Sequence, residues 1–219
     1  MARNDAVDWE GTRLPVVWDQ PAAGDTYLLL GHGAGGTLHT PALAQYARAL
    51  AAAGVGAVRF NFPYAEAGRK VPDRQAILER CFRAVAEHVR PRVGRLYLGG
   101  RSMGGRIASH IVAAGVPASG LVFLSYPLHP PGQPQRLRSA HLEKVSVPML
   151  FLHGTRDAFA REGLLREVLA GLPTATLYDV EGADHGLTVR GRDPGDVTRE
   201  LVSVTRRWMA DRAGSGRRK

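Results

Sequence analysis

Short apolar runs alternate with amphipathic stretches along most of the chain. The apolar runs read as strands at 14–18, 26–31, 56–62, 95–100, 120–126, 147–154 and 175–180. The amphipathic stretches read as helices at 41–54, 72–90, 104–115, 161–172 and around 197–211. Near-continuous apolar strands separated by helices predict an α/β fold, in which a mostly parallel sheet carries helices on both faces. Ligands of such folds bind at the carboxyl ends of the strands.

The length and composition are those of one globular domain. A chain of 219 residues is long enough to bury a sizeable core. We expect the domain to cover residues 1–212 and the basic segment 213–219 to be disordered. We expect neither a signal peptide nor a membrane span, because no apolar run is suitable. The lone cysteine, Cys81, favours the reducing cytoplasm.

The charge balance is strongly basic, with a formal net charge of +9. Such a charge raises the question of nucleic acid as a partner. All basic residues except Lys70, Lys144 and Lys219 are arginines, and they are scattered rather than clustered. Since no aromatic residues interleave with a basic patch, the sequence argues against nucleic-acid binding. A preference for small anionic substrates stays open.

The stretch Gly100-Arg101-Ser102-Met103-Gly104 has the form G-x-S-x-G and lies between a predicted strand and a predicted helix. This context is typical of a nucleophile elbow, a tight turn that lifts a serine hydroxyl above the sheet. The same turn presents the backbone N–H of Met103 to that space, at a helix N-terminus where negative charge is favoured. Ser102 is therefore the candidate nucleophile.

A serine nucleophile needs a base that is held by a third group. Among the histidines after Ser102, His185 lies in a loop between the last strand and the last helix, which favours it over His129, His141 and His153. Asp157, in the loop after the penultimate strand, is the candidate acid. Asp184 is adjacent to His185 and therefore badly placed for its Nδ1 atom. The order serine, acid, histidine is that of α/β hydrolases.

The glycines Gly31, Gly33 and Gly36 match G-x-G-x-x-G, a spacing that also occurs in dinucleotide-binding loops. A dinucleotide site needs an acidic residue at the end of the next strand, but residues 51–64 contain none. We therefore interpret this loop as half of an oxyanion hole. Ala34 N–H is the candidate donor beside Met103 N–H, with Gly33 or Gly35 as alternatives.

Together, the motifs "GHGAGG", "RFNFPY", "GGRSMGGR", "LSYPLHPPG", "LHGTRD" and "DHGL" resemble those of small α/β hydrolases of the dienelactone-hydrolase-like superfamily. Within it, the chain is most similar to the branch of testis-expressed hydrolase-like proteins and the hydrolase-like subunit of the NSL histone acetyltransferase complex. The resemblance implies an α/β-hydrolase fold with Ser102, Asp157 and His185 as the triad. Dienelactone hydrolases proper use a cysteine nucleophile, so the resemblance does not imply lactone specificity.

Only 55 positions separate Ser102 from Asp157, which leaves no room for a cap domain. We expect an open, shallow site whose substrate contacts come from Tyr64, Arg101, Tyr126, Leu128 and His129. Arg101, joined by Arg106, Arg69 or Arg156, would hold an anionic acyl group if it faces this site. The alternative is that Arg101 turns sideways and pairs with a neighbouring acid.

The sequence thus predicts a serine hydrolase of small esters or thioesters that needs no metal or other cofactor. No cluster of histidine and acidic residues has the spacing of metal ligands. The alternative is a hydrolase-like interaction module with little turnover, which the eukaryotic relatives and the basic charge favour. Labelling by a fluorophosphonate distinguishes the two.

Overall fold

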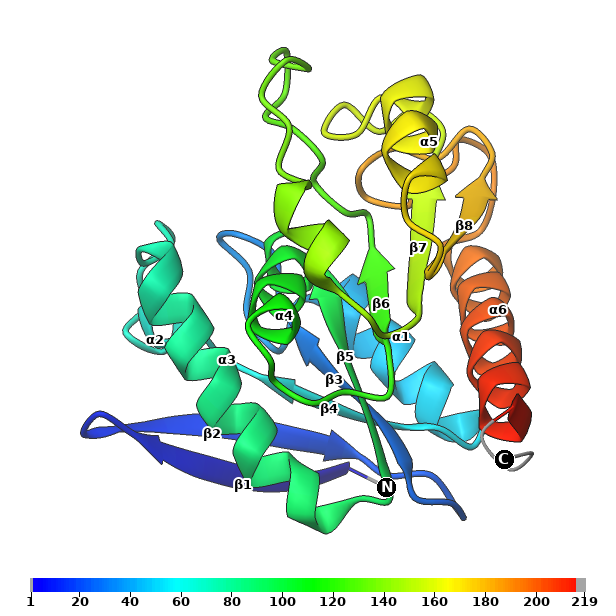
Figure 1. Ribbon diagram of the computed structural model, residues 1–219. Coiled ribbons are helices and arrows are strands. Elements are labelled where there is room, and N and C mark those ends of the chain that lie inside the picture. Colours follow the sequence, from blue (N-terminus) through cyan, green and yellow to red (C-terminus); the bar gives the residue numbers. More distant parts are fainter. Residues whose placement is uncertain (1, 216–219) are drawn as a thin grey trace.

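This computed structural model describes residues 2–215. Eight strands in this part of the chain form one sheet (Figure 1). The strands are β1 (Ala2–Trp9), β2 (Thr12–Asp19), β3 (Thr26–Gly31), β4 (Gly56–Phe60), β5 (Arg95–Arg101), β6 (Leu121–Leu124), β7 (Met149–Gly154) and β8 (Ala175–Val180). Their order across the sheet is β1-β2-β4-β3-β5-β6-β7-β8. Strands β3 to β8 are parallel, whereas β1 and β2 add an antiparallel edge.

Helices cover both faces of this sheet, as the sequence predicts. The helices are α1 (Pro41–Ala52), α2 (Pro63–Glu66), α3 (Gln75–Val89), α4 (Met103–Ala113), α5 (Glu162–Ala170) and α6 (Pro194–Ser215), with short 3₁₀ turns η1 (Arg90–Arg92) and η2 (Ala140–Lys144). Helices α3, α4 and α5 pack on one face, which we call the α3 face. Helices α1 and α6 pack on the other, the α1 face.

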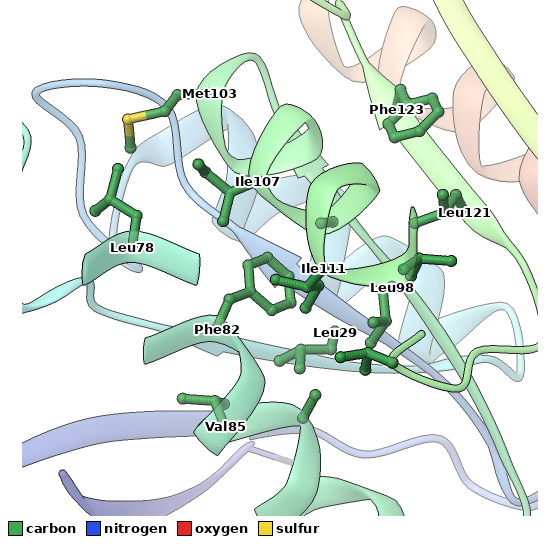
Figure 2. Packing of buried hydrophobic residues seen from close by; sticks show 14 of the residues in the cluster. Leu29, Leu78, Phe82, Val85, Leu98, Met103, Ile107, Ile111, Leu121 and Phe123 are labelled. Carbon is green, nitrogen blue, oxygen red and sulfur yellow. The ribbon is translucent and has the colours of Figure 1, made fainter. Parts of the chain in front are cut away.

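Each parallel strand contributes alternate side chains to two separate cores. In β5, Leu96 and Leu98 join the core of the α3 face, whereas Tyr97 joins that of the α1 face. Figure 2 shows the first core, in which Phe82 of α3 and Ile107 of α4 lie over strand residues such as Leu98. Burial on both faces explains the near-continuous apolar runs of these strands. The same alternation decides on which face each residue at a strand end lies.

The antiparallel edge is the main difference from the predicted strands. Strand β1 pairs with β2 through a two-residue turn at Glu10 and Gly11, both of which have positive φ angles. Half of the β1 residues are exposed, and only Val7 is buried. Because only Val7 and Trp9 of this strand contact the core, β1 shows no sustained hydrophobic alternation, and the sequence pattern did not predict it.

The last helix also ends later than the sequence pattern predicts. Helix α6 continues to Ser215, so residues 213–215, expected in the disordered tail, have a helical backbone. The rest of that segment, 216–219, lies outside the described residues. Among residues 2–215, no helix is long and apolar enough to cross a membrane. The link between β6 and β7, residues 125–148, holds η2 and loops but no separate cap domain.

Candidate active site

The turn between β5 and α4 has the backbone of a nucleophile elbow. Ser102 has a φ angle of +50° and a ψ angle of −115°, a region that non-glycine residues rarely adopt. The turn also brings β5 and α4 against β3. A Cβ atom on Gly100 would lie 2.3 Å from the Gly31 carbonyl oxygen, and one on Gly104 would lie 2.1 Å from it. Glycine is therefore required at both positions of the G-x-S-x-G motif.

Three polar side chains from three loops meet above this turn. The Nε2 atom of His185 lies 2.9 Å from the Oγ atom of Ser102. Its Nδ1 atom lies 2.8 Å and 2.9 Å from the two carboxylate oxygens of Asp157. Since a carboxylate only accepts hydrogen bonds, Nδ1 carries the proton and Nε2 accepts the hydrogen bond of the serine hydroxyl. The structure thus brings together the three residues that the sequence selected as nucleophile, base and acid.

The surroundings of His185 hold its ring in place. The Asp157 side chain is fully buried, whereas that of His185 is 21% exposed and so reachable from solvent. Phe159 stacks on the His185 ring at 4.2 Å, and its backbone N–H donates to Asp157 Oδ1 over 2.7 Å. Asp184 accepts the N–H groups of Gly186 and Thr188, which closes the loop that carries His185. Phe159 was not predicted, because a lone aromatic residue two positions after the acid carries no specific signal.

The loop after β3 lies beside Ser102. A Cβ atom on Gly33 would lie 3.7 Å from Ser102 Cβ, an ordinary van der Waals distance, so the backbone of this loop lies close to the nucleophile. Among the described residues, neither Ala34 N–H nor Met103 N–H has a hydrogen-bond acceptor. Ala34 is exposed, and Met103 is the first residue of α4, where N–H groups have no acceptor within the helix. Two N–H donors, one at the start of α4 and one in the loop after β3, are therefore unused.

His32 and Tyr64 fix the peptide that carries the Ala34 N–H. His32 Nε2 accepts the Phe62 N–H over 3.1 Å, so Nδ1 is the protonated nitrogen and donates to the Gly33 carbonyl oxygen over 2.9 Å. The Tyr64 hydroxyl also donates to this oxygen and accepts the Gly35 N–H. Burial lowers the pKa of His32 to about 4, so its ring is neutral at pH 7. A carbonyl held this way orients the N–H on the other side of the same peptide.

Two further polar residues, from the "RFNFPY" segment, brace the same loop. The Arg59 guanidinium donates to the Leu38 carbonyl oxygen over 2.5 Å and pairs with Asp19 at 2.8 Å. Asn61 Oδ1 accepts the Leu38 N–H over 2.8 Å. Neither residue was predicted to have a role. An arginine within an otherwise apolar strand was the available signal, because a buried charge needs a partner.

Four of the five expected substrate contacts need correction. The side chains of Tyr64, Tyr126, Leu128 and His129 are at most 2% exposed. Tyr126 donates to the Arg138 carbonyl oxygen, and His129 accepts the Arg161 N–H, so they hold loops rather than line an open surface. Aromatic and histidine residues of loops suggest contact with a ligand. Here the side chains are buried beneath their own loops, and the polar atoms of Tyr126 and His129 form hydrogen bonds with backbone groups.

The Arg101 side chain lies on the α1 face of the sheet, away from the position expected for a substrate contact. Its Nη1 atom lies 3.4 Å from the Gly186 carbonyl oxygen. Arg106 lies on α4, on the opposite face, where it donates to Gln75. Arg69 pairs with Asp73. Arg101, Arg106 and Arg69 therefore do not meet around one acyl group, and Arg101 contacts a carbonyl rather than an acid.

The sheet order, the elbow and the grouping of Ser102, His185 and Asp157 are those of an α/β hydrolase. A model of the alpha/beta hydrolase domain matches residues 24–211, and the chain belongs to this family. Within the described residues, no group of three or more histidine, cysteine and acidic side chains is placed to hold a metal ion.

Solved structures show the same fold over almost the whole chain. An alpha-beta serine hydrolase homologue from Coxiella burnetii has a TM-score of 0.76 at 18% identity, covering 92% of this chain and 96% of its own. A serine hydrolase without a lid from Xanthomonas campestris has a TM-score of 0.74 at 25% identity, covering 94% of both chains. A dienelactone hydrolase from Anabaena variabilis has a TM-score of 0.75 at 15% identity, covering 96% and 97%.

Proposed function

We propose that this α/β hydrolase is a serine hydrolase of small esters or thioesters. The observation that supports the proposal most strongly is the pair of contacts made by His185, 2.9 Å to Ser102 Oγ and 2.8 Å to the Asp157 carboxylate. A serine hydroxyl is a weak nucleophile at neutral pH unless a base accepts its proton. His185 Nε2 is within reach of that proton, and Asp157 fixes the tautomer that leaves Nε2 free to accept it.

In the proposed reaction, Ser102 Oγ attacks the carbonyl carbon of the substrate while His185 takes the hydroxyl proton. The carbonyl oxygen becomes an oxyanion, for which Ala34 N–H and Met103 N–H are the proposed donors. When the tetrahedral intermediate collapses, His185 returns the proton to the leaving alcohol or thiol, and the acyl group stays on Ser102. Water, deprotonated by His185, then attacks the acyl carbon. The bond from this carbon to Ser102 Oγ breaks, His185 returns the proton to Oγ, and the carboxylic acid leaves.

Small substrates are proposed because no cap domain is present in the 125–148 link between β6 and β7. Such domains enclose long acyl chains in larger members of this fold.

We also propose that the protein works in the cytoplasm, since its only cysteine, Cys81, is a buried free thiol. The proposed placement near the testis-expressed and NSL-complex branch rests on the sequence motifs alone.

Hydrolysis of p-nitrophenyl acetate tests the proposal. We expect turnover by the wild-type protein and a loss of roughly 10⁴-fold or more in kcat for His185→Ala, because the base is removed. His39→Ala is the matched control, since His39 is exposed and outside the site, and it should keep wild-type turnover. Absence of hydrolysis by folded wild-type protein, or equal rates for wild-type and His185→Ala, contradicts the proposal and favours an interaction module.

A further inference from the structure

A small cavity lies on the α1 face, at the carboxyl end of β5. Its volume is about 90 Å³, and it lies between α1, α6 and the loop that follows His185. Most of its walls are apolar, and they include Leu43, Leu124, Leu187, Val197 and Leu201. Arg101 lines it as well, because the side chain of the residue before Ser102 extends to this face. A charged group thus borders a mainly apolar space.

The charge of Arg101 has no acidic partner at close range. Within residues 2–212, its only hydrogen bond is the 3.4 Å contact with the Gly186 carbonyl oxygen, and no carboxylate lies within 4.0 Å. The second arginine at the cavity, Arg192, is paired with Glu200 at 2.5 Å. Asp184 and Asp157 act on Arg101 only at longer range, and burial lowers its pKa. Most of the five N–H donors of this guanidinium are therefore available.

We propose that this cavity binds a small monocarboxylate with a short apolar chain. The carboxylate would pair with the Arg101 guanidinium, whose planar donors match two carboxylate oxygens. The hydrocarbon chain would contact the leucine and valine side chains of the walls, where leaving water is favourable. A phosphate dianion fits less well, because Glu200 already neutralises the other arginine.

This site is distinct from the proposed reaction centre. The described residues that line the cavity include neither Ser102, nor His185, nor the glycines of the loop after β3. The two sites are nevertheless adjacent, since Arg101 precedes Ser102 and Gly186 follows His185 in the chain. Binding of the carboxylate requires no turnover, so the inference stands or falls separately from the proposed function.

Calorimetric titration with hexanoate tests the inference. The protein used is the Ser102→Ala variant, in which the proposed nucleophile is absent. We expect one hexanoate per chain and at least about tenfold weaker binding of hexanamide, which has the same chain but no charge. Arg101→Gln should weaken hexanoate binding by a similar factor. Arg207→Gln, which removes an exposed arginine of α6 outside the cavity, should leave the affinity unchanged.

A second variant tests the location. Ala42 is exposed and lines the cavity, so Ala42→Trp should obstruct its mouth without disturbing the core and abolish hexanoate binding. Absence of hexanoate binding to the Ser102→Ala protein overturns the inference. So does binding that is equal in Arg101→Gln and Arg207→Gln, because the charge of Arg101 would then play no part.

Discussion

Arg101 and Ser102 are neighbours in the chain, yet their side chains lie in opposite surroundings. Ser102 ends a series of hydrogen bonds that continues through His185 to a buried carboxylate. Arg101 lies on the α1 face with one long contact to a backbone carbonyl. In the first environment the polar side chains are paired with one another, whereas the second is mostly apolar and leaves side-chain donors unused.

The difference follows from the geometry of a strand that ends in a tight turn. Successive side chains of a strand point to opposite faces, so Arg101 follows Tyr97 to the α1 face. Ser102 leaves this pattern because its positive φ angle turns the chain into α4. The turn at Ser102 thus separates the proposed nucleophile from the proposed ligand site at Arg101. Variants of the two residues can be tested independently.

Among Asp157→Asn, His32→Asn and Arg101→Met, the largest effect is expected from Asp157→Asn, on the Ser102 side. The Phe159 N–H needs an acceptor, so the amide oxygen of the new asparagine would occupy that position and its NH₂ group would face His185. His185 Nδ1 would then become an acceptor and Nε2 would carry the proton, which prevents it from accepting the serine proton. We expect a fall in kcat of roughly 10⁴-fold.

Steady-state hydrolysis of p-nitrophenyl acetate measures this effect, and Asp184→Asn is the matched control. Asp184 accepts two backbone N–H groups of its own loop, a role that the amide oxygen of asparagine can keep. Its activity should therefore stay within about tenfold of wild type. Similar losses in the two variants would show that Asp157 acts only by holding its loop.

The next effect concerns stability and involves the loop on the other side of Ser102. Burial lowers the pKa of His32 from 6.5 to about 4, so the unfolded chain binds more protons than the folded one between these values. The free energy of unfolding should therefore fall as the pH decreases from about 6.5 to about 4, with His32 contributing up to about 3 kcal/mol.

Urea unfolding at pH 7, 5.5 and 4 measures this dependence. His32→Asn should reduce this dependence, because one buried neutral histidine is gone, whereas His110, His141 and His153, whose pKa values burial also lowers, keep their share of it. His39→Asn removes an exposed histidine of the same loop and should keep the wild-type dependence. If wild type and His32→Asn lose the same free energy between pH 7 and 4, His32 is not the neutral support of the Gly33 peptide that the hydrogen bonds indicate.

The smallest effect is expected on the Arg101 side. Desolvation outweighs the attraction of Asp184 and Asp157 for this guanidinium, so its charge costs folding free energy. Arg101→Met keeps the length of the side chain and removes the charge, and it should raise the free energy of unfolding by about 1 kcal/mol or less, since the group is partly solvated. A loss of stability in denaturant unfolding would show that the bond to Gly186 outweighs that cost.

The residues of the candidate site were predictable to different degrees. Ser102, Asp157 and His185 could be selected because spacing, chain order and position at strand ends all agreed. Tyr64 and His129 were misjudged, because a sequence does not show whether a loop side chain points outward or fills the base of its own loop. Arg59 and Phe159 act through contacts with loops distant in the chain, which no local pattern reveals.

The fold shows the same limit. The parallel strands were predicted from their apolar runs because both of their faces are buried. Strand β1 is held mainly by backbone pairing with β2, and its exposed polar side chains give no periodic signal. The end of α6 was also placed too early, since the composition of residues 213–215 suggests a tail although their backbone is helical.

Reaction with a fluorophosphonate tests the central claim most directly. This probe forms a covalent bond with an activated serine and needs no knowledge of the substrate. We predict one phosphonyl group per wild-type chain by intact-mass spectrometry, located on Ser102 by peptide mapping, and none on folded Ser102→Ala. A folded wild-type protein that never labels, or a label that persists in Ser102→Ala, would contradict the assignment of Ser102 as the nucleophile.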